Sequence, residues 1–232
     1  MEIDVYESLV GQTTLVTGAT RGIGVEIANA LEANGATVYA GARDPTDVGS
    51  ASQRPIELDV TNDRSIAAAV ARLDDEVGQL DVLVNNAGVA GPEAPLHEVG
   101  IDEIDATFAV NLRGPVALTS RALPLLLESP GGRVVNVSSG MGALGEGMSG
   151  GYPPYRISKA GLNGLTVYLH GEYGSDGLIA NAACPGWVRT DLGSPNAPKS
   201  PAEGAETPAW LATFEPGSPG GLFWRDRKRI DW

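Results

Sequence analysis

The stretch TTLVTGATRGIG, residues 13–24, decides the expected fold. Its first five residues predict a short buried strand from Thr13 to Thr17. Glycines occupy the first, fifth and seventh positions of the run from Gly18, and apolar residues then recur at helical spacing from Ile23 to Ala33. A glycine-rich turn between a strand and a helix lets the backbone approach a pyrophosphate, which the N–H groups at the start of the helix can bind. The stretch therefore predicts a nucleotide-binding unit, and a turn without a ligand is the alternative.

Strand-like and helix-like segments alternate along the rest of the chain. Further strands are expected at Thr37 to Ala42, Ile56 to Val60, Leu80 to Val84, Arg133 to Val137, Leu178 to Ala183 and Gly221 to Trp224. Helices are expected at Ser65 to Val77, with Ser65 as the N-cap, and at Ile101 to Leu112, Val116 to Leu127 and Tyr155 to Tyr173. This alternation predicts one α/β domain over residues 1–232, a doubly wound parallel sheet of the Rossmann type with helices on both faces. The stretch at about 186–202, rich in Pro, Gly and Ser, predicts a mobile substrate loop followed by a short helix.

The charge balance of the chain limits its partners. The 232 residues, 42% of them hydrophobic, include 29 Asp and Glu and 16 Lys and Arg, which gives a formal net charge of −13. An excess of carboxylates repels phosphates, so we expect neither nucleic acid nor an anionic membrane as a partner. Only three of the cations are lysines, which is typical either of a salt-adapted, halophilic surface or of a genome rich in arginine codons.

The scarce cysteine and histidine residues limit the chemistry further. Cys184 is the single cysteine, so no internal disulfide can form, and a reducing, cytoplasmic compartment is expected. Met1 to Val10 is acidic without a basic cluster, so we expect no signal peptide. No apolar run approaches the ~20 residues that span a bilayer. His97 and His170 lack metal-ligand spacing, so no metal site is expected.

Tyr155 and Lys159 stand four residues apart in an expected helix and therefore share one face. A free tyrosine has a pKa of about 10 and is a poor acid or base at neutral pH. A nearby ammonium group favours the phenolate, so Lys159 is expected to lower the pKa of Tyr155 toward a useful range. The alternative is an ordinary helix with one aromatic side chain and one surface charge.

Six motifs follow one another along the chain: the glycine run 17–24, Asn85-Asn86-Ala87-Gly88, Asn111 in its helix, Ser138-Ser139, Tyr155 with Lys159, and Pro185-Gly186 with Val188 and Thr190. In this order they resemble the short-chain dehydrogenase/reductase family and its carbonyl-reductase-like members. The resemblance covers about residues 11–192. It implies the catalytic residues Asn111, Ser139, Tyr155 and Lys159, with Ser138 as the alternative serine. It implies cofactor contacts from Gly18, Thr20, Arg21, Gly22, Ile23, Gly24, Asp59, Val60, Asn86, Ala87, Gly88, Tyr155, Lys159, Pro185, Gly186, Val188 and Thr190.

The end of the second expected strand indicates which dinucleotide binds. NAD-binding chains usually carry an acidic residue about twenty residues after the glycine loop, whereas Arg43 stands there in this chain. A guanidinium group can bind a 2′-phosphate, and Arg21 in the glycine loop is a second cation within reach. We therefore expect NADP(H) as the cofactor. The neighbouring Asp44 could weaken this preference, and a surface ion pair of Arg43 with Asp44 or Asp47 is the alternative.

These features predict NADPH-dependent reduction of a small ketone or aldehyde to an alcohol, or the reverse oxidation. The resemblance implies that Tyr155 is the acid/base, that Ser139 holds the carbonyl oxygen, and that Lys159 also binds the ribose while Asn111 supports a proton relay. A non-catalytic NADP(H) sensor or scaffold, an NAD-dependent alcohol dehydrogenase and an epimerase on the same fold are the alternatives. The segment between Ser139 and Tyr155 lacks the long insertion of monomeric carbonyl reductases, which implies a homodimer or homotetramer.

Overall fold

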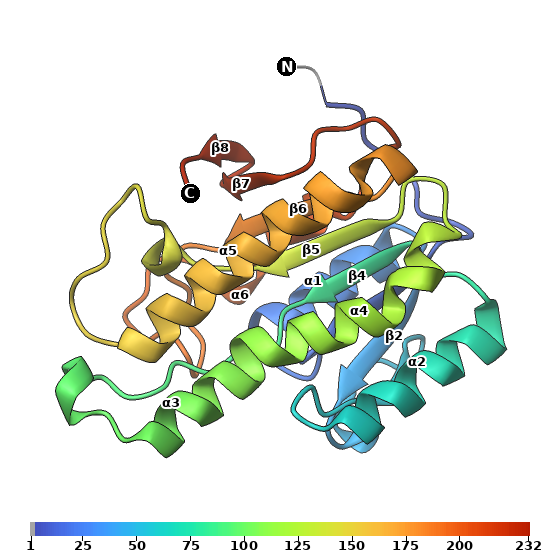
Figure 1. Ribbon diagram of the computed structural model, residues 1–232. Helices are drawn as coiled ribbons and strands as arrows, with labels where there is room; N and C mark the ends of the chain where they lie inside the picture. The colour runs from blue at the N-terminus through green and yellow to red at the C-terminus, as the bar shows by residue number, and fades with distance from the viewer. Residues whose placement is uncertain (1–2) are drawn as a thin grey trace.

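One eight-stranded sheet forms the centre of the protein (Figure 1). The computed structural model describes residues 3–232. The strand order is β3-β2-β1-β4-β5-β6-β7-β8, and every neighbouring pair is parallel except β7 and β8. The strands are β1 (Thr13–Thr17), β2 (Thr37–Ala42), β3 (Arg54–Glu57), β4 (Val82–Asn85), β5 (Arg133–Val137), β6 (Ile179–Cys184), β7 (Leu222–Arg225) and β8 (Lys228–Ile230). The predicted doubly wound parallel sheet is confirmed.

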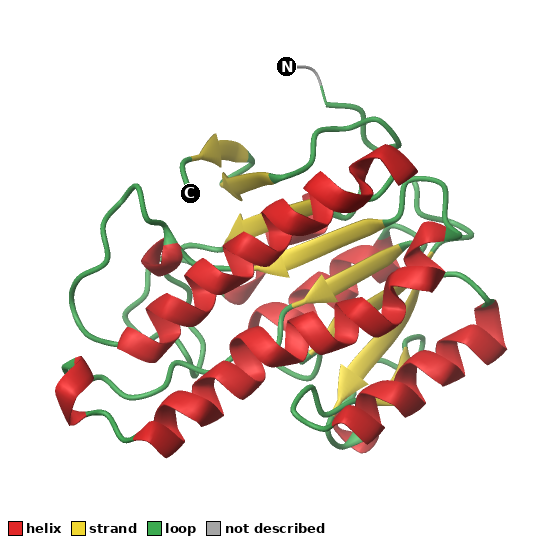
Figure 2. Cartoon of the chain, viewed as in Figure 1, coloured by secondary structure: helices red, strands yellow, loops and turns green. Residues whose placement is uncertain are grey.

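Helices cover both faces of the sheet (Figures 1 and 2). On one face, α1 (Gly22–Ala33) packs beside α6 (Pro201–Leu211), and on the other lie α2 (Asp63–Val77), α4 (Gly114–Leu127) and α5 (Pro153–Tyr173). Each face buries its own cluster of aliphatic side chains because each of these helices presents an apolar stripe to the strands. The connections change direction between β1 and β4, and the carboxyl ends of strands at such a switch point are where this fold class binds ligands.

The region around β3 begins and ends differently from the expectation. β3 spans Arg54–Glu57 rather than Ile56 to Val60, because the chain turns at Asp59, whose carboxylate accepts a backbone N–H two residues later at 2.9 Å. The N-cap of α2 is Asn62, not Ser65. The hydroxyl of Ser65 instead accepts the backbone N–H of Asp59 at 2.9 Å. The serine therefore fixes the turn in front of the helix.

The two helices expected at 101–112 and 116–127 are joined without a break. α3 (Ile101–Phe108) continues through a π-helical turn, η3 (Ala109–Arg113), into α4. Pro115 lacks a backbone N–H, and the π-helical turn before it takes up the altered hydrogen-bond register. Sequence periodicity could not show this, because a π turn adds one residue to a helical turn without any residue type that marks it.

The two ends of the chain add smaller findings. The loop expected at about 186–202 ends at Ser200, whose hydroxyl caps α6 by accepting the N–H of Glu203 at 3.2 Å. β8 was not anticipated. No helix within residues 3–232 combines the length and apolar character needed to cross a membrane. Met1 and Glu2, part of the segment inspected for a signal peptide, lie outside the described residues.

Candidate active site

The glycine loop after β1 has the shape of a phosphate cradle. Gly18 and Gly22 have φ values of +64° and +57°, which favour glycine. A Cβ atom on Gly24 would lie 2.1 Å from the carbonyl oxygen of Gly18 and 2.4 Å from Nδ2 of Asn86. Arg21, at the N-cap position of α1, makes no side-chain cap hydrogen bond. The backbone N–H groups in the first turn of α1 can therefore donate hydrogen bonds to an anion. Such a set of donors fits a dinucleotide pyrophosphate.

Asn86 and Thr17 join the ends of β4 and β1. Nδ2 of Asn86 donates to the Thr17 carbonyl at 2.9 Å and to the Gly18 carbonyl at 3.3 Å. The hydroxyl of Thr17 accepts the backbone N–H groups of Asn86 and Ala87, each at 2.9 Å. Thr17 was part of the glycine run seen in the sequence, but no role in the site was assigned to it. Its position at the end of a buried strand, directly before the glycine loop, was the available signal.

Tyr155 and Lys159 lie together on α5, facing the carboxyl end of β5. Both side chains are buried, and Nζ of Lys159 lies 5.6 Å from the centre of the Tyr155 ring. Nζ donates to the backbone carbonyl of Val137 at 2.7 Å. The side chain of Ser139 lies close enough to Tyr155 to lower the pKa of the tyrosine. The fold therefore brings together three side chains spread over 21 residues of sequence.

The two adjacent serines have different surroundings. Ser138 is buried, and its hydroxyl donates to Oδ1 of Asn163 at 2.6 Å. Ser139 caps the short η4 turn (Gly140–Gly142), where its Oγ accepts the N–H of Met141 at 3.1 Å, and it also reaches Tyr155. The geometry favours Ser139 over Ser138 as the serine that contacts a substrate.

Burial dominates the protonation of the tyrosine and the lysine. It raises the pKa of Tyr155 to about 12, and the neighbouring hydroxyl of Ser139 acts in the opposite direction. It lowers the pKa of Lys159 to about 8. The expectation that Lys159 brings the pKa of Tyr155 below its ordinary value is wrong for this structure, because loss of water disfavours both charged forms. Of the two groups, Lys159 has the pKa nearer to neutral pH.

Asn111 lies in the π-helical turn and is fully buried. Its side-chain amide forms a two-way contact with Val89, with Oδ1 accepting the N–H at 2.9 Å and Nδ2 donating to the carbonyl at 2.8 Å. Nδ2 also lies 3.1 Å from Oγ of Ser158. These bonds fix the segment that follows Gly88. Gly88 itself lies beside Lys159, since a Cβ atom built on it would be 3.7 Å from Nζ of the lysine. π turns occur frequently at functional sites.

Arg43 and Arg21 are exposed cations near the ends of β2 and β1. The pKa of Asp59 is lowered by hydrogen bonds from Thr61, with a smaller contribution from the charge of Arg43. The carboxylate of Asp44 accepts the N–H of its near neighbour Thr46 at 2.9 Å. Arg21 pairs with Asp191 of the loop before α6, with Nε 3.2 Å from Oδ2. Both guanidinium groups are exposed, but a phosphate would have to compete with Asp191 for Arg21.

The segment after β6 passes over the glycine loop. A Cβ on Gly22 would lie 3.2 Å from Cγ2 of Thr190. Val188 is buried against Gly204 of α6, so its side chain holds the segment in place. Gly186 has a φ of +85°, and Trp187 beside it is 57% exposed. The side chain of Lys199, which the sequence did not single out, lies against Gly186 and donates to the Pro185 carbonyl at 3.1 Å.

The remaining expected cofactor residues lie at the same edge of the sheet or just beyond it. Thr20 follows β1, Ile23 lies in the first turn of α1, Val60 follows β3, and Ala87 and Gly88 follow β4. Cys184 is buried. Within residues 3–232, no group of three or more His, Cys, Asp and Glu side chains forms a candidate metal site.

Comparison with known sequences identifies the family. The model of the short chain dehydrogenase family matches residues 12–200. The chain belongs to this family. It is 34% identical to carbonyl reductase (NADPH) 1 of Oryctolagus cuniculus over 279 aligned positions, which cover 95% of this chain and 98% of that protein. It is 36% identical to cis-4-hydroxycyclohexanecarboxylate dehydrogenase of Sinomonas cyclohexanicum over 194 residues, 80% of this chain and 77% of that protein.

A solved structure agrees with the sequence comparison. The NADPH-bound carbonyl reductase from chicken fatty liver superposes with a TM-score of 0.86 at 26% identity, covering 97% of this chain and 100% of that one. The expected resemblance to carbonyl-reductase-like members of the short chain dehydrogenase family is thereby confirmed.

Proposed function

We propose that this short chain dehydrogenase reduces the carbonyl group of a small ketone or aldehyde with NADPH, and oxidises the alcohol in the reverse direction. The observation that carries the proposal is the buried pair of Tyr155 and Lys159, with the hydroxyl of Ser139 close enough to Tyr155 to affect its pKa. A proton donor, a second hydroxyl and a cation at one point can hold a carbonyl oxygen and protonate it as negative charge develops there.

Each residue has a separate task in this scheme. When bound, NADPH supplies a hydride for the carbonyl carbon. The hydroxyl of Ser139 donates a hydrogen bond to the carbonyl oxygen, and the hydroxyl of Tyr155 gives its proton to that oxygen. The ammonium group of Lys159 stabilises the phenolate that Tyr155 leaves behind. Asn111 holds the backbone around Val89 against α5 and supports the path by which Tyr155 regains its proton.

We propose NADP(H) rather than NAD(H) as the cofactor on the basis of two exposed arginines and the glycine loop. Arg43 and Arg21 offer two guanidinium groups at the strand ends where a 2′-phosphate would lie. The glycine loop offers the pyrophosphate site. The relative from Oryctolagus cuniculus is a carbonyl reductase (NADPH) that aligns over nearly the whole chain. We further propose that the segment 186–202 is the substrate loop of this unit.

Replacing Tyr155 with phenylalanine tests the function. The variant is expected to lose at least a thousandfold in kcat with a panel of ketones and aldehydes, while its NADPH dissociation constant stays within a fewfold of wild type. Tyr173→Phe is the matched control, because Tyr173 lies at the far end of the same helix. Near-wild-type reduction by Tyr155→Phe would refute the assignment. NADPH binding without turnover of any carbonyl by the wild type would favour the non-catalytic sensor.

We also propose that the chain forms a homo-oligomer through α4 and α5. The outer faces of these helices expose Val116 and Leu127 on α4, and Ile157, Val167 and Tyr168 on α5. Exposed apolar side chains on helices that cover the same face of a sheet are compatible with an interface between copies. Light scattering of the purified protein should give a multiple of 24.0 kDa, and Val167→Asp should shift it toward the monomer. A monomeric wild type would contradict the proposal.

A further inference from the structure

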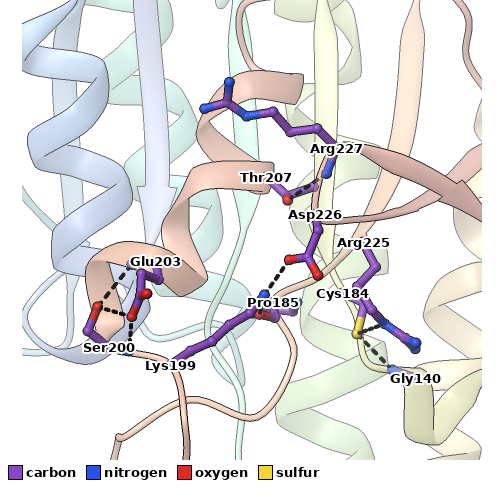
Figure 3. A network of polar contacts seen from close by, with 10 residues as sticks. All are labelled: Gly140, Cys184, Pro185, Lys199, Ser200, Glu203, Thr207, Arg225, Asp226 and Arg227. Atoms are coloured by element: carbon purple, nitrogen blue, oxygen red, sulfur yellow. Dashed lines mark hydrogen bonds and ion pairs between the residues drawn. The ribbon is translucent and has the colours of Figure 1, made fainter.

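The hairpin formed by β7 and β8 has an unusual turn. Asp226 and Arg227, its two central residues, have φ values of +53° and +57°, a region that non-glycine residues seldom adopt. Tight hairpin turns of this kind usually carry Asn-Gly or Asp-Gly. A strained conformation of this kind persists where surrounding contacts fix it. The side chains of Arg225, which precedes the turn, and of Asp226 make contacts with two loops of the candidate active site (Figure 3).

Arg225, the last residue of β7, holds the loop that follows Ser139. Its two terminal nitrogens pair with the two carboxylate oxygens of Glu146 at 2.9 and 3.0 Å. A Cβ on Gly140 would lie 2.3 Å from Nη2 of Arg225 and 3.1 Å from Oε2 of Glu146. The ion pair therefore lies directly on the residue next to Ser139. A bidentate guanidinium–carboxylate pair fixes orientation as well as distance.

Two further contacts hold the same loop. The Sγ atom of Cys184 accepts the N–H of Gly140 at 3.2 Å and lies 3.4 Å from Nε of Arg225 (Figure 3). The N–H of Gly145 donates to the carbonyl of Trp232 at 2.6 Å, and the Trp232 ring stacks on Phe223 of β7. The loop is thus bound to the hairpin at its beginning and near its end.

Asp226, the next residue, contacts the second loop, the Pro185-Gly186 segment after β6. Its carboxylate pairs with Lys199, whose Nζ also donates to the Pro185 carbonyl at 3.1 Å (Figure 3). The Lys199 side chain lies along Gly186, with Nζ 3.2 Å from a Cβ built there. One ion pair of the hairpin therefore reaches the Ser139 loop, and the neighbouring ion pair reaches the Pro185-Gly186 segment.

We propose that Arg225 and Asp226 are positioning residues that set the two walls of the active site independently. This proposal rests on the proposed reductase function. Arg225, through Gly140, sets where the Ser139 hydroxyl meets the carbonyl oxygen and so affects the chemical step. Asp226, through Lys199, sets the Pro185-Gly186 segment and so affects NADPH binding. Neither side chain contacts the reacting atoms.

Two substitutions separate the two effects. Arg225→Met removes the guanidinium group, and we expect kcat to fall roughly ten- to hundredfold, the scale of a misplacement of about 1 Å, with the NADPH dissociation constant within twofold of wild type. Asp226→Asn keeps a residue that tolerates positive φ but removes the charge. It is expected to weaken NADPH binding about three- to tenfold with kcat within twofold. Arg72→Met, which removes the Arg72–Glu76 ion pair on α2, is the control and should change neither quantity.

Rescue and hydrogen exchange distinguish positioning from general destabilisation. The charge-swapped variant Glu146→Arg/Arg225→Glu should recover most of the lost kcat, and Arg225→Lys should lie between the wild type and Arg225→Met. In the NADPH-loaded protein, Arg225→Met should speed amide exchange within residues 140–147, and Asp226→Asn within 185–199. Thermal unfolding of each variant shows whether it is folded.

The outcomes are decisive either way. The proposal is wrong if Arg225→Met leaves kcat within twofold, if both variants loosen the same segment, or if both Arg225→Lys and the charge swap perform no better than Arg225→Met. Amide exchange and NADPH binding do not depend on turnover. If the wild type reduces no carbonyl, the proposed function fails while these two measurements still decide whether the hairpin holds the two loops separately.

Discussion

Replacing Lys159 with methionine is expected to stabilise the folded chain near neutral pH while it removes carbonyl reduction. The lysine is 4% exposed and has one hydrogen-bond acceptor, the Val137 carbonyl at 2.7 Å. Methionine has a similar length and no charge, so it fills the same space without the cost of burying an ammonium group. A residue retained at the expense of stability is what a functional role would require.

The magnitude follows from the pKa of the lysine. Burial lowers the pKa of Lys159 from 10.5 to about 8, which corresponds to about 3 kcal/mol against the charged form in the folded state. Methionine leaves the Val137 carbonyl without this donor, which costs about 1–2 kcal/mol. Lys159→Met should therefore raise the free energy of unfolding by about 1–2 kcal/mol at pH 7. For a chain of this size, the melting temperature should rise by about 2–8 °C.

The gain should reverse at high pH. Lys159 is charged below about pH 8 in the folded chain and below 10.5 in the unfolded chain. Between these values the unfolded chain binds more protons, so the stability of the wild type rises as the pH rises. Methionine has no titrating group. The advantage of Lys159→Met should therefore shrink by about 3 kcal/mol between pH 7 and pH 11 and change sign.

Urea unfolding, monitored by tryptophan fluorescence, measures this difference at each pH. Comparing each variant with the wild type at the same pH cancels the titration of all other groups. Lys228→Met is the matched control, because Lys228 is exposed and its replacement should change stability by less than about 0.5 kcal/mol at every pH. The reasoning fails if Lys159→Met is less stable than the wild type at pH 7. It also fails if the difference does not vary from pH 7 to pH 11.

Three further substitutions test other parts of the structure. Gly24→Ala places a methyl group 2.1 Å from the Gly18 carbonyl oxygen, so NADPH binding measured by calorimetry should weaken at least tenfold; unchanged binding would contradict the cradle. Arg43→Asp should raise the NADPH dissociation constant about tenfold relative to that of NADH, and an unaltered ratio would remove Arg43 from the 2′-phosphate site. Arg133→Met leaves buried carbonyls, including that of Ala212, without their donor, and should lower stability by about 3 kcal/mol in urea unfolding; a loss below 1 kcal/mol would contradict this.

Periodicity and turn residues predicted the central sheet because these signals are local. The strand Thr13–Thr17 and the glycine loop after it are adjacent in sequence, so residue types alone indicate a strand, a turn and a helix. The π-helical turn at Ala109–Arg113 has no such marker and was missed. The N-cap of α2 was also missed, because Asn62 and Ser65 are both good capping residues and the choice depends on a bond to Asp59.

In the candidate site too, features set by neighbouring residues were predicted, and features set by tertiary packing were not. Tyr155 and Lys159 were predicted as a pair because four residues make one helical turn. Their protonation was not, because burial depends on every element packed around them, and it reversed the expected direction for Tyr155. Arg225 and Glu146 lie 79 residues apart, and neither belongs to a motif. Two residues so far apart in sequence come into contact only when the whole sheet has formed, so local sequence patterns could not predict this ion pair.

The fold divides the cations of this acidic chain into two kinds that respond differently to solvent. Arg21 and Arg43 are exposed at strand ends, where counterions screen charges beyond about 8 Å at physiological salt. The net charge of −13 therefore acts weakly on them, and their local position decides whether a 2′-phosphate binds. Lys159 is buried beside Tyr155, where salt does not reach and a charge interacts strongly with its neighbours. In the proposed enzyme, cofactor choice therefore depends on salt-sensitive surface groups, whereas proton transfer depends on a lysine protected from the solvent.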